Sequence, residues 1–235
     1  MYNAPVRATT IKLIAIVLLA GALRVLAAFV VQDAHVSWDY EYEIIAQNLV
    51  QGNGYAYDFY GLSESQPTSF QPPVYPLFLA GLARLAPGST VGLAAMQILL
   101  SLLSIVLLFK LTCAQGGSTA QGLLAALMLA AYPPINLHAV IPSSVTLEIL
   151  FLLAGVLCTL RSQQSSLPAW PLAAGLSFGM ASLTRSPWLV AIPIAMLWTS
   201  WQTEHAGLRR WRTALLLLGA ALLTFFPWAL HNRQV

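Results

Sequence analysis

Long apolar runs with almost no charge constrain this chain more than any other feature. Of its 235 residues, 58% are hydrophobic and only 8% are Asp, Glu, Lys or Arg, whereas about a quarter of the residues in a soluble domain are charged. A water-soluble fold of this composition would expose large apolar patches. A helix satisfies its backbone hydrogen bonds within the segment and can therefore face lipid. We predict an all-α polytopic membrane protein, and the net charge of +3 does not indicate a nucleic-acid partner.

The apolar runs predict about seven transmembrane helices. A span needs roughly 17–25 mostly apolar residues, and we place the spans at 11–31, 91–111, 119–138, 144–160, 169–185, 187–201 and 213–230. The first run also fits a cleaved signal peptide, since Arg7 and Lys12 precede it, but its length favours a retained helix. Residues 74–85 are apolar but too short to span, and predict a helix lying at the membrane interface.

The distribution of Lys and Arg predicts the orientation, because cytoplasmic loops carry an excess of these residues. With a cytoplasmic N-terminus, seven of them lie inside and three outside. The inner seven are Arg7, Lys12, Lys110, Arg161, Arg209, Arg210 and Arg212, and the outer three are Arg84, Arg185 and Arg233. We therefore expect a multi-pass protein of the cell inner (plasma) membrane.

The first external loop, residues 32–73, is strongly acidic. It holds six of the eight acids and no Lys or Arg. Within it, residues 39–50 have helical spacing, with Asp39, Glu43 and Gln47 on one face and Tyr42, Ile45 and Leu49 on another. We predict a helix that lies along the membrane surface with its carboxylates facing water.

Two carboxylates of the predicted outer side are candidates for chemistry. Asp39, one turn before Glu43, can act as a general base at a partly dry interface, although acids are also favoured at any helix N-terminus. Glu148 lies about one turn inside the fourth predicted span. Intramembrane acids are costly and mark functional sites by default, but a side chain at this depth can also reach the interface without a function.

Arginines on the same side are candidates for binding an anion. Arg185, between the fifth and sixth predicted spans, can grip a phosphate with two parallel hydrogen bonds, or anchor a lipid headgroup instead. Arg24 lies inside the first span, about 10 Å from its end, where it should pair with an acid or reach up to the interface, and a structural pairing is expected. Together, two carboxylates and one or two arginines beside apolar spans suit a substrate that is both a lipid and a phosphate.

A metal site is a further alternative, formed by His35, Asp39, His138 and Glu148. The spacing typical of metal ligands is absent, so no cofactor is assigned, and a divalent metal ion stays an open alternative.

Six features in order resemble the GT-C superfamily of membrane glycosyltransferases, closest to the dolichyl-phosphate-mannose protein mannosyltransferase-like and aminoarabinose transferase-like family. The first is Arg24 in the first span. The other five are WDYEY at 38–42 with AQNL at 46–49 and GNGY at 52–55, PPVYPLFLA at 72–80, YPP at 132–134 followed by EILF at 148–151, GLSFGMASLTR at 175–185, and PW at 227–228 with HN at 231–232. Gln71 stands where many members of that family carry a cation.

The resemblance implies transfer, with inversion, of a sugar from an undecaprenyl- or dolichyl-phosphate donor to a lipid, glycan or protein acceptor on the outer face. Asp39 falls on the catalytic acid of the family, Glu148 on the acid of its fourth helix and Arg185 on the cation of its fifth. We assign Glu148, Arg185, Glu43 and Tyr42 to substrate binding, and Arg24 and Arg84 to structural or phosphate-binding roles. Because members are longer, residues 1–235 are expected to form a single GT-C-like domain that continues beyond the C-terminus of this sequence.

Two other functions fit the same residues. A non-catalytic membrane subunit would bind a polyprenyl-phosphate lipid or a partner protein without transferring a sugar. A transporter is less consistent with the pattern, because transporters place charges and broken helices near the bilayer midplane, whereas the polar groups here gather at one surface.

Overall fold

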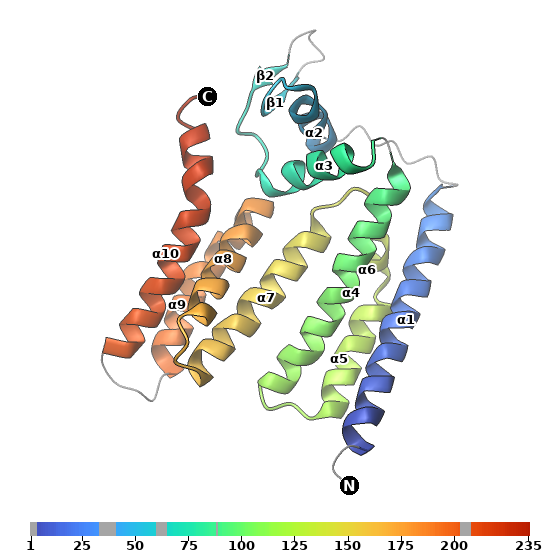
Figure 1. The fold of residues 1–235 in the computed structure, drawn as a ribbon, viewed down its shortest axis with the longest axis vertical. Helices are drawn as coiled ribbons and strands as arrows, with labels where there is room; N and C mark the ends of the chain where they lie inside the picture. Colours follow the sequence, from blue (N-terminus) through green and yellow to red (C-terminus); the bar gives the residue numbers. More distant parts are fainter. Residues whose placement is uncertain (1–3, 33–40, 60–64, 88, 203–207) are drawn as a thin grey trace.

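A computed structural model describes residues 4–32, 41–59, 65–87, 89–202 and 208–235, and these are almost entirely helical (Figure 1). The helices are α1 (Ala4–Gln32), α2 (Glu41–Gln51), α3 (Val74–Leu85), α4 (Thr90–Ala114), α5 (Thr119–Ala131), α6 (Pro133–His138), α7 (Val145–Gln164), α8 (Ala169–Thr184), the 3₁₀ helix η1 (Ser186–Val190), α9 (Ala191–Gln202) and α10 (Leu208–His231). Within the described residues, the strands are β1 (Ala56–Tyr57) and β2 (Gln66–Pro67), which pair antiparallel.

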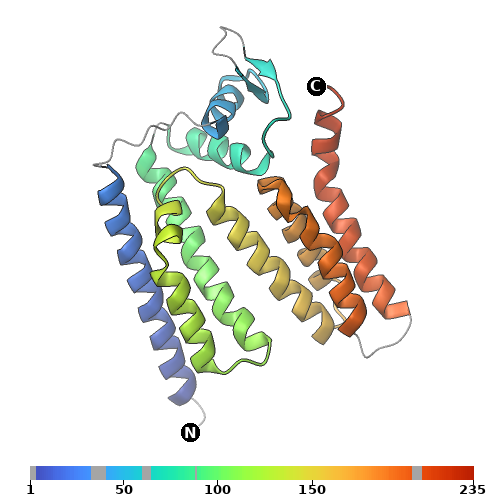
Figure 2. The same cartoon turned by 180° about the vertical axis from the view of Figure 1, so that it is seen from behind.

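Among the described residues, four helices are long and apolar enough to cross a membrane, which confirms the prediction of a polytopic helical membrane protein. They cover Arg7–Val31, Thr90–Ala114, Val145–Gln164 and Trp211–His231. The shorter α8 runs between the same two ends of the bundle, whereas α5 and α9 cover only part of this length and are continued by α6 and η1 (Figures 1 and 2). The count of seven spans stays a prediction, because it depends on these shorter helices.

The predicted span 119–138 is not one continuous helix. It divides into α5 and α6 at Tyr132, whose backbone is extended (φ −72°, ψ 111°). The physical reason is the Pro133-Pro134 pair, because a proline disfavours helical backbone in the residue before it and lacks an N–H to donate. The span predicted at 187–201 likewise begins as the 3₁₀ helix η1 around Pro187.

One end of the bundle is covered by α2, β1, β2 and α3, which we call the cap (Figures 1 and 2). The C-terminus lies at this cap end, and the N-terminus at the opposite end. The helix predicted at 74–85 is confirmed as α3, and the helix predicted at 39–50 corresponds to α2. The cap packs on α7 through a buried cluster that includes Ala46, Tyr75, Leu79 and Leu147.

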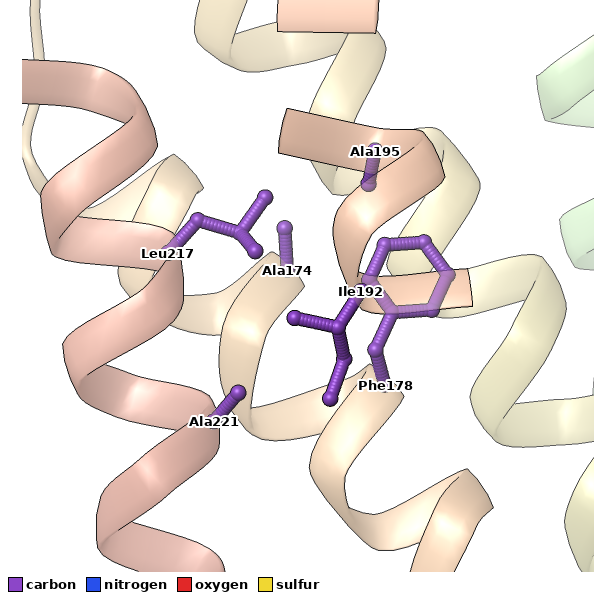
Figure 3. Packing of buried hydrophobic residues seen from close by; sticks show 6 residues of the cluster. All are labelled: Ala174, Phe178, Ile192, Ala195, Leu217 and Ala221. Atoms are coloured by element: carbon purple, nitrogen blue, oxygen red, sulfur yellow. The ribbon is translucent and has the colours of Figure 1, made fainter. Parts of the chain in front are cut away.

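The helices α8, α9 and α10 pack around a second apolar cluster of Ala174, Phe178, Ile192, Ala195, Leu217 and Ala221 (Figure 3). Small residues allow α8 to approach α10 closely. A methyl group at Gly175 would collide with the carbonyl oxygen of Leu217, and one at Gly179 would collide with Thr224. Small residues at such contacts are how membrane helices come close enough for dispersion forces to hold them. This packing places the ends of α8 and α10 beside the cap.

Candidate active site

The Glu148 carboxylate and the Arg185 guanidinium meet at the cap end of the bundle. Oε2 of Glu148 lies 3.4 Å from Nη1 of Arg185, and the two side chains are 9% and 49% exposed. Glu148 is in the first turn of α7, where the helix dipole favours a negative charge, and Arg185 follows the last residue of α8. The pair leaves much of the guanidinium open to a further anion.

A cavity of about 170 Å³ borders the chain on both sides of Arg185. Its walls come from the segment before α3, the end of α8, η1 and α10. They include the hydroxyl residues Ser69, Ser182 and Ser186, and the aromatic residues Phe70 and Trp228. Arg185 and Glu148 are not among the lining residues, but Ser186, the neighbour of Arg185 in the chain, is. The cavity itself offers hydroxyl groups and apolar surface next to this half-exposed cation, a combination that suits an amphipathic anion.

The end of α10 is joined to the cap beside this cavity. Nε2 of His231 lies 2.9 Å from the carbonyl oxygen of Thr68, and since a carbonyl only accepts, this nitrogen carries the proton. The His231 ring stacks on Trp228, and both rings contact Tyr55 edge-on. Burial raises the pKa of Tyr55, which keeps its hydroxyl protonated as the donor to the carbonyl oxygen of Gln71 at 2.7 Å.

Gln71, which occupies the position of a cation in many members of the family that the sequence resembles, has a local role here. Its Nε2 donates to Oε2 of Glu41 at 2.9 Å. This bond joins the start of α2 to the segment that leads into α3. A neutral amide can make this contact as a cation would, but it adds no positive charge to the site.

Asn48 holds the hairpin against α2. Its Nδ2 donates to the carbonyl oxygen of Ala56 at 2.9 Å and to Oγ of Ser65 at 3.1 Å. After α2, Gly52 and Gly54 have positive φ values of 87° and 78°, a conformation that glycine adopts without steric cost. The chain can therefore reverse and form the β1–β2 pair in contact with α2.

Glu43 and Tyr42 lie on the inner side of α2. The Tyr42 ring meets Tyr75 edge-on at 5.1 Å. Glu43 lines a second cavity of about 290 Å³, which α2, α3 and the start of α4 enclose mainly with apolar side chains, among them Leu79, Leu82 and Leu93. The two carboxylate oxygens of Glu43 are themselves shielded from solvent. The prediction that this carboxylate faces water is therefore wrong, because α3 and the start of α4 pack over this side of α2.

The other two predicted arginines lie apart from the Glu148–Arg185 pair. Arg24 is fully buried, and its Nε and Nη1 donate to Oγ of Ser101 and to the carbonyl oxygen of Ala20, each at 3.0 Å. In the described part of the chain, Arg24 thus bonds to a hydroxyl and a carbonyl rather than to the expected acid. Arg84 is exposed in the last turn of α3.

Asp39, the predicted catalytic residue, and His35 lie outside the described residues, so the structure does not place them. Within the ranges that it does describe, no group of three or more His, Cys, Asp or Glu side chains lies close enough to hold a metal ion. His138 instead contacts Oγ of Ser143 through its Nδ1 at 2.9 Å.

Two residues outside the predicted site, Tyr75 and Gln97, are buried between the cap and the bundle. Gln97 is a polar residue about two turns inside an apolar span, and this polarity was the signal available in the sequence. Tyr75 was quoted only as part of a motif, since nothing in the sequence showed that its hydroxyl would face α4.

Comparison with known proteins identifies one family. Residues 70–231 match the family described as dolichyl-phosphate-mannose-protein mannosyltransferase. The matched stretch includes Arg84, Glu148 and Arg185 and begins after Asp39. A search of curated proteins gave no match to the chain.

Proposed function

The chain belongs to the dolichyl-phosphate-mannose-protein mannosyltransferase family, which makes it a glycosyltransferase of the GT-C kind, and from this premise we propose its reaction. It transfers a sugar from a polyprenyl-phosphate donor to an acceptor on the outer face of the membrane. In this proposal the protein lies in the plasma membrane, with the cap end of the bundle facing outward and the N-terminus in the cytoplasm.

The observation that carries this proposal is the Glu148–Arg185 pair beside the 170 Å³ cavity. Glu148 is almost buried and holds one side of the guanidinium. This contact restricts the orientation of the Arg185 guanidinium and so of its remaining N–H groups. A phosphate accepts two parallel hydrogen bonds from such a group. Arg185 would therefore bind the donor phosphate, with Glu148 orienting the cation.

The chemistry of the transfer is a single displacement. The acceptor oxygen forms a bond to the anomeric carbon of the sugar while the bond from that carbon to the phosphate oxygen breaks. The acceptor proton passes to a carboxylate, which we assign to Asp39 on the basis of the family resemblance, and the polyprenyl phosphate leaves with both bonding electrons. Arg185 would stabilise the negative charge that develops on the leaving phosphate, since a fixed cation in a partly dry site does this without reorganisation.

The remaining predicted site residues have supporting roles in this proposal. Glu43 would line the space on the α2 side where an acceptor approaches, because it borders the 290 Å³ cavity. Tyr42 would support this binding side from its edge-on contact with Tyr75. Arg24 would be structural, since it is bonded to Ser101 inside the bundle. Arg84 would contact lipid phosphate, since it is exposed in the last turn of α3, far along that helix from Pro72 of the first cavity.

The test is reconstitution of the full chain in lipid nanodiscs with radiolabelled undecaprenyl-phosphate mannose or undecaprenyl-phosphate aminoarabinose. Membranes from cells that lack the protein serve as the source of acceptors. Transfer of label into a lipid, glycan or protein fraction is expected with the wild-type chain and not with empty nanodiscs. Donor binding without any transfer would instead support a non-catalytic subunit, and absence of both would contradict the proposal.

A further inference from the structure

Tyr75 and Gln97 form a buried polar contact that the proposed site does not use. Tyr75 of α3 is 0% exposed and Gln97 of α4 is 1% exposed. The Tyr75 hydroxyl donates to Oε1 of Gln97 at 2.9 Å. Burial raises the pKa of Tyr75, and the nearby Glu43 carboxylate adds to this effect, so the hydroxyl keeps its proton and stays a donor.

Gln97 extends this contact to the turn that precedes α7. Its Nε2 donates to the carbonyl oxygen of Ile141 at 2.6 Å, and its Oε1 also accepts from the backbone N–H of Ser143 at 3.4 Å. The amide thus uses both its donor and its acceptor atoms on groups outside its own helix. A side chain with these bonds has a single orientation, because any rotation would leave buried polar groups unpaired.

The turn that Gln97 holds leads directly into the helix that carries Glu148. Thr146 donates through its Oγ1 to the carbonyl oxygen of His138 at 3.2 Å. The backbone N–H of Glu148 donates to the carbonyl oxygen of Ser144 at 3.0 Å. The position of Ser143 and Ser144 therefore determines where the first turn of α7, and with it the Glu148 carboxylate, lies.

On its other side, Tyr75 holds the cap. Its ring meets Tyr42 edge-on at 5.1 Å, and Tyr42 precedes Glu43 in α2. The same ring belongs to the buried cluster with Ala46 and Leu79. A series of contacts thus runs from α2 through Tyr75 and Gln97 to the turn before α7.

We propose that the hydrogen bond between Tyr75 and Gln97 is a positioning contact that sets the cap in register with the Glu148–Arg185 pair. The inference rests on the proposed glycosyl transfer, in which groups from the cap and from the bundle act on one substrate. An apolar pair of the same volume would pack as well, because buried polar pairs add little net stability over apolar ones. What the polar pair provides is one defined arrangement of α3, α4 and the turn. Misplacement of reacting groups by about 1 Å lowers rates on the order of 100-fold.

The kinetic test is Tyr75→Phe, which removes one oxygen atom and keeps the ring. We expect kcat for sugar transfer to fall about tenfold or more, with KM for the undecaprenyl-phosphate sugar within about twofold and a thermal midpoint close to that of the wild type. The matched control is Ser104→Ala, which removes an equally buried hydroxyl from α4 that donates only to Leu100 of its own helix. An unchanged kcat in Tyr75→Phe, or an equal loss in the control, would overturn the proposal.

A double variant tests whether the bond itself is responsible. If it is, Tyr75→Phe combined with Gln97→Leu should have the same kcat as Gln97→Leu alone, because the second change removes a partner that is already lost. Independent, multiplying losses would show that the two residues act separately and would contradict the assignment.

A distance measurement tests positioning without any activity. Spin labels at Gln47→Cys in α2 and Ser186→Cys in η1 report on the cap and the bundle, in a chain whose two cysteines, Cys113 and Cys158, are replaced by Ser. Tyr75→Phe should broaden or shift the distance distribution, and Ser104→Ala should leave it unchanged. An unaltered distribution in Tyr75→Phe overturns the positioning role even if transfer is observed. A chain without transfer but with a broadened distribution contradicts the proposed function alone.

Discussion

Glu148 and Arg185 lie 37 residues apart in the sequence, and their side chains approach to 3.4 Å because α7 and α8 pack against each other up to the cap end. Gly155 of α7 makes room for Phe178 of α8, which allows the two helices to come close. The carboxylate is almost buried and the guanidinium half exposed. Glu148 therefore holds the guanidinium in place, and Arg185 is available to bind a ligand.

Removing the cation should weaken donor binding. Arg185→Ala deletes charge-assisted hydrogen bonds, each about 1.5–3 kcal/mol, so we expect KM for the undecaprenyl-phosphate sugar to rise about 10- to 100-fold. The control is Arg161→Ala, since Arg161 is an exposed arginine in the last turn of α7, at the far end of that helix from Glu148. Equal KM values for Arg185→Ala and the wild type in nanodiscs would exclude a phosphate contact at Arg185.

Removing the charge of the Glu148 carboxylate should lower donor affinity less than removing Arg185. Glu148→Gln keeps the shape of the side chain but weakens its hold on the guanidinium. We expect a loss of donor affinity smaller than that of Arg185→Ala, and little further loss when both are changed, because Glu148 acts on the phosphate only through Arg185. Additive losses in this double-mutant cycle would show that Glu148 acts independently of Arg185.

The contact between α8 and α10 should be intolerant of added volume. A methyl group at Gly175 collides with the Leu217 backbone, so Gly175→Ala should lower the free energy of unfolding by about 1–3 kcal/mol through overpacking. Gly219 of α10 has no neighbour within 4 Å of an added methyl group, and Gly219→Ala should be neutral or stabilising by up to about 1 kcal/mol. Thermal unfolding in detergent compares the two, and a similar midpoint for both would contradict the close approach.

The hydrogen bond from His231 to Thr68 should hold the cap on α10. His231→Phe keeps a ring to stack on Trp228 but removes the donor of the 2.9 Å bond. We expect faster hydrogen exchange in residues 65–70 and little change in α4. The neighbouring exposed Arg233→Ala is the control, and an unchanged exchange rate in His231→Phe would show that stacking alone holds the segment.

The sequence predicted the helices well where an apolar run ends in clear boundary residues. α3 has the predicted bounds because Pro72 and Pro73 mark its start. α8 has nearly the predicted bounds because the polar turn before Pro168 marks its start. The break at Tyr132 was missed because hydropathy counts Pro133 and Pro134 as part of an apolar run, whereas their backbone geometry interrupts the helix.

The residues of the candidate site were only partly accessible from the sequence. Arg185 and Glu148 stood out because charge inside or beside an apolar span is costly. That the two form a pair depends on the packing of α7 on α8, which no local pattern encodes. The roles of Tyr75 and Gln97 depend on where α3 lies on α4, and the cap position of Thr68 depends on a histidine 163 residues away.

The most direct measurement of the central claim is the rate of sugar transfer by Asp39→Asn in reconstituted nanodiscs. The control is Glu64→Gln, which removes an acid from the same acidic loop outside the family motifs. If Asp39 takes the acceptor proton, Asp39→Asn should lower kcat at least about 100-fold, leave donor binding unchanged and differ sharply from Glu64→Gln. Transfer by Asp39→Asn at the wild-type rate would contradict the assignment of the catalytic acid, and with it the mechanism proposed for this site.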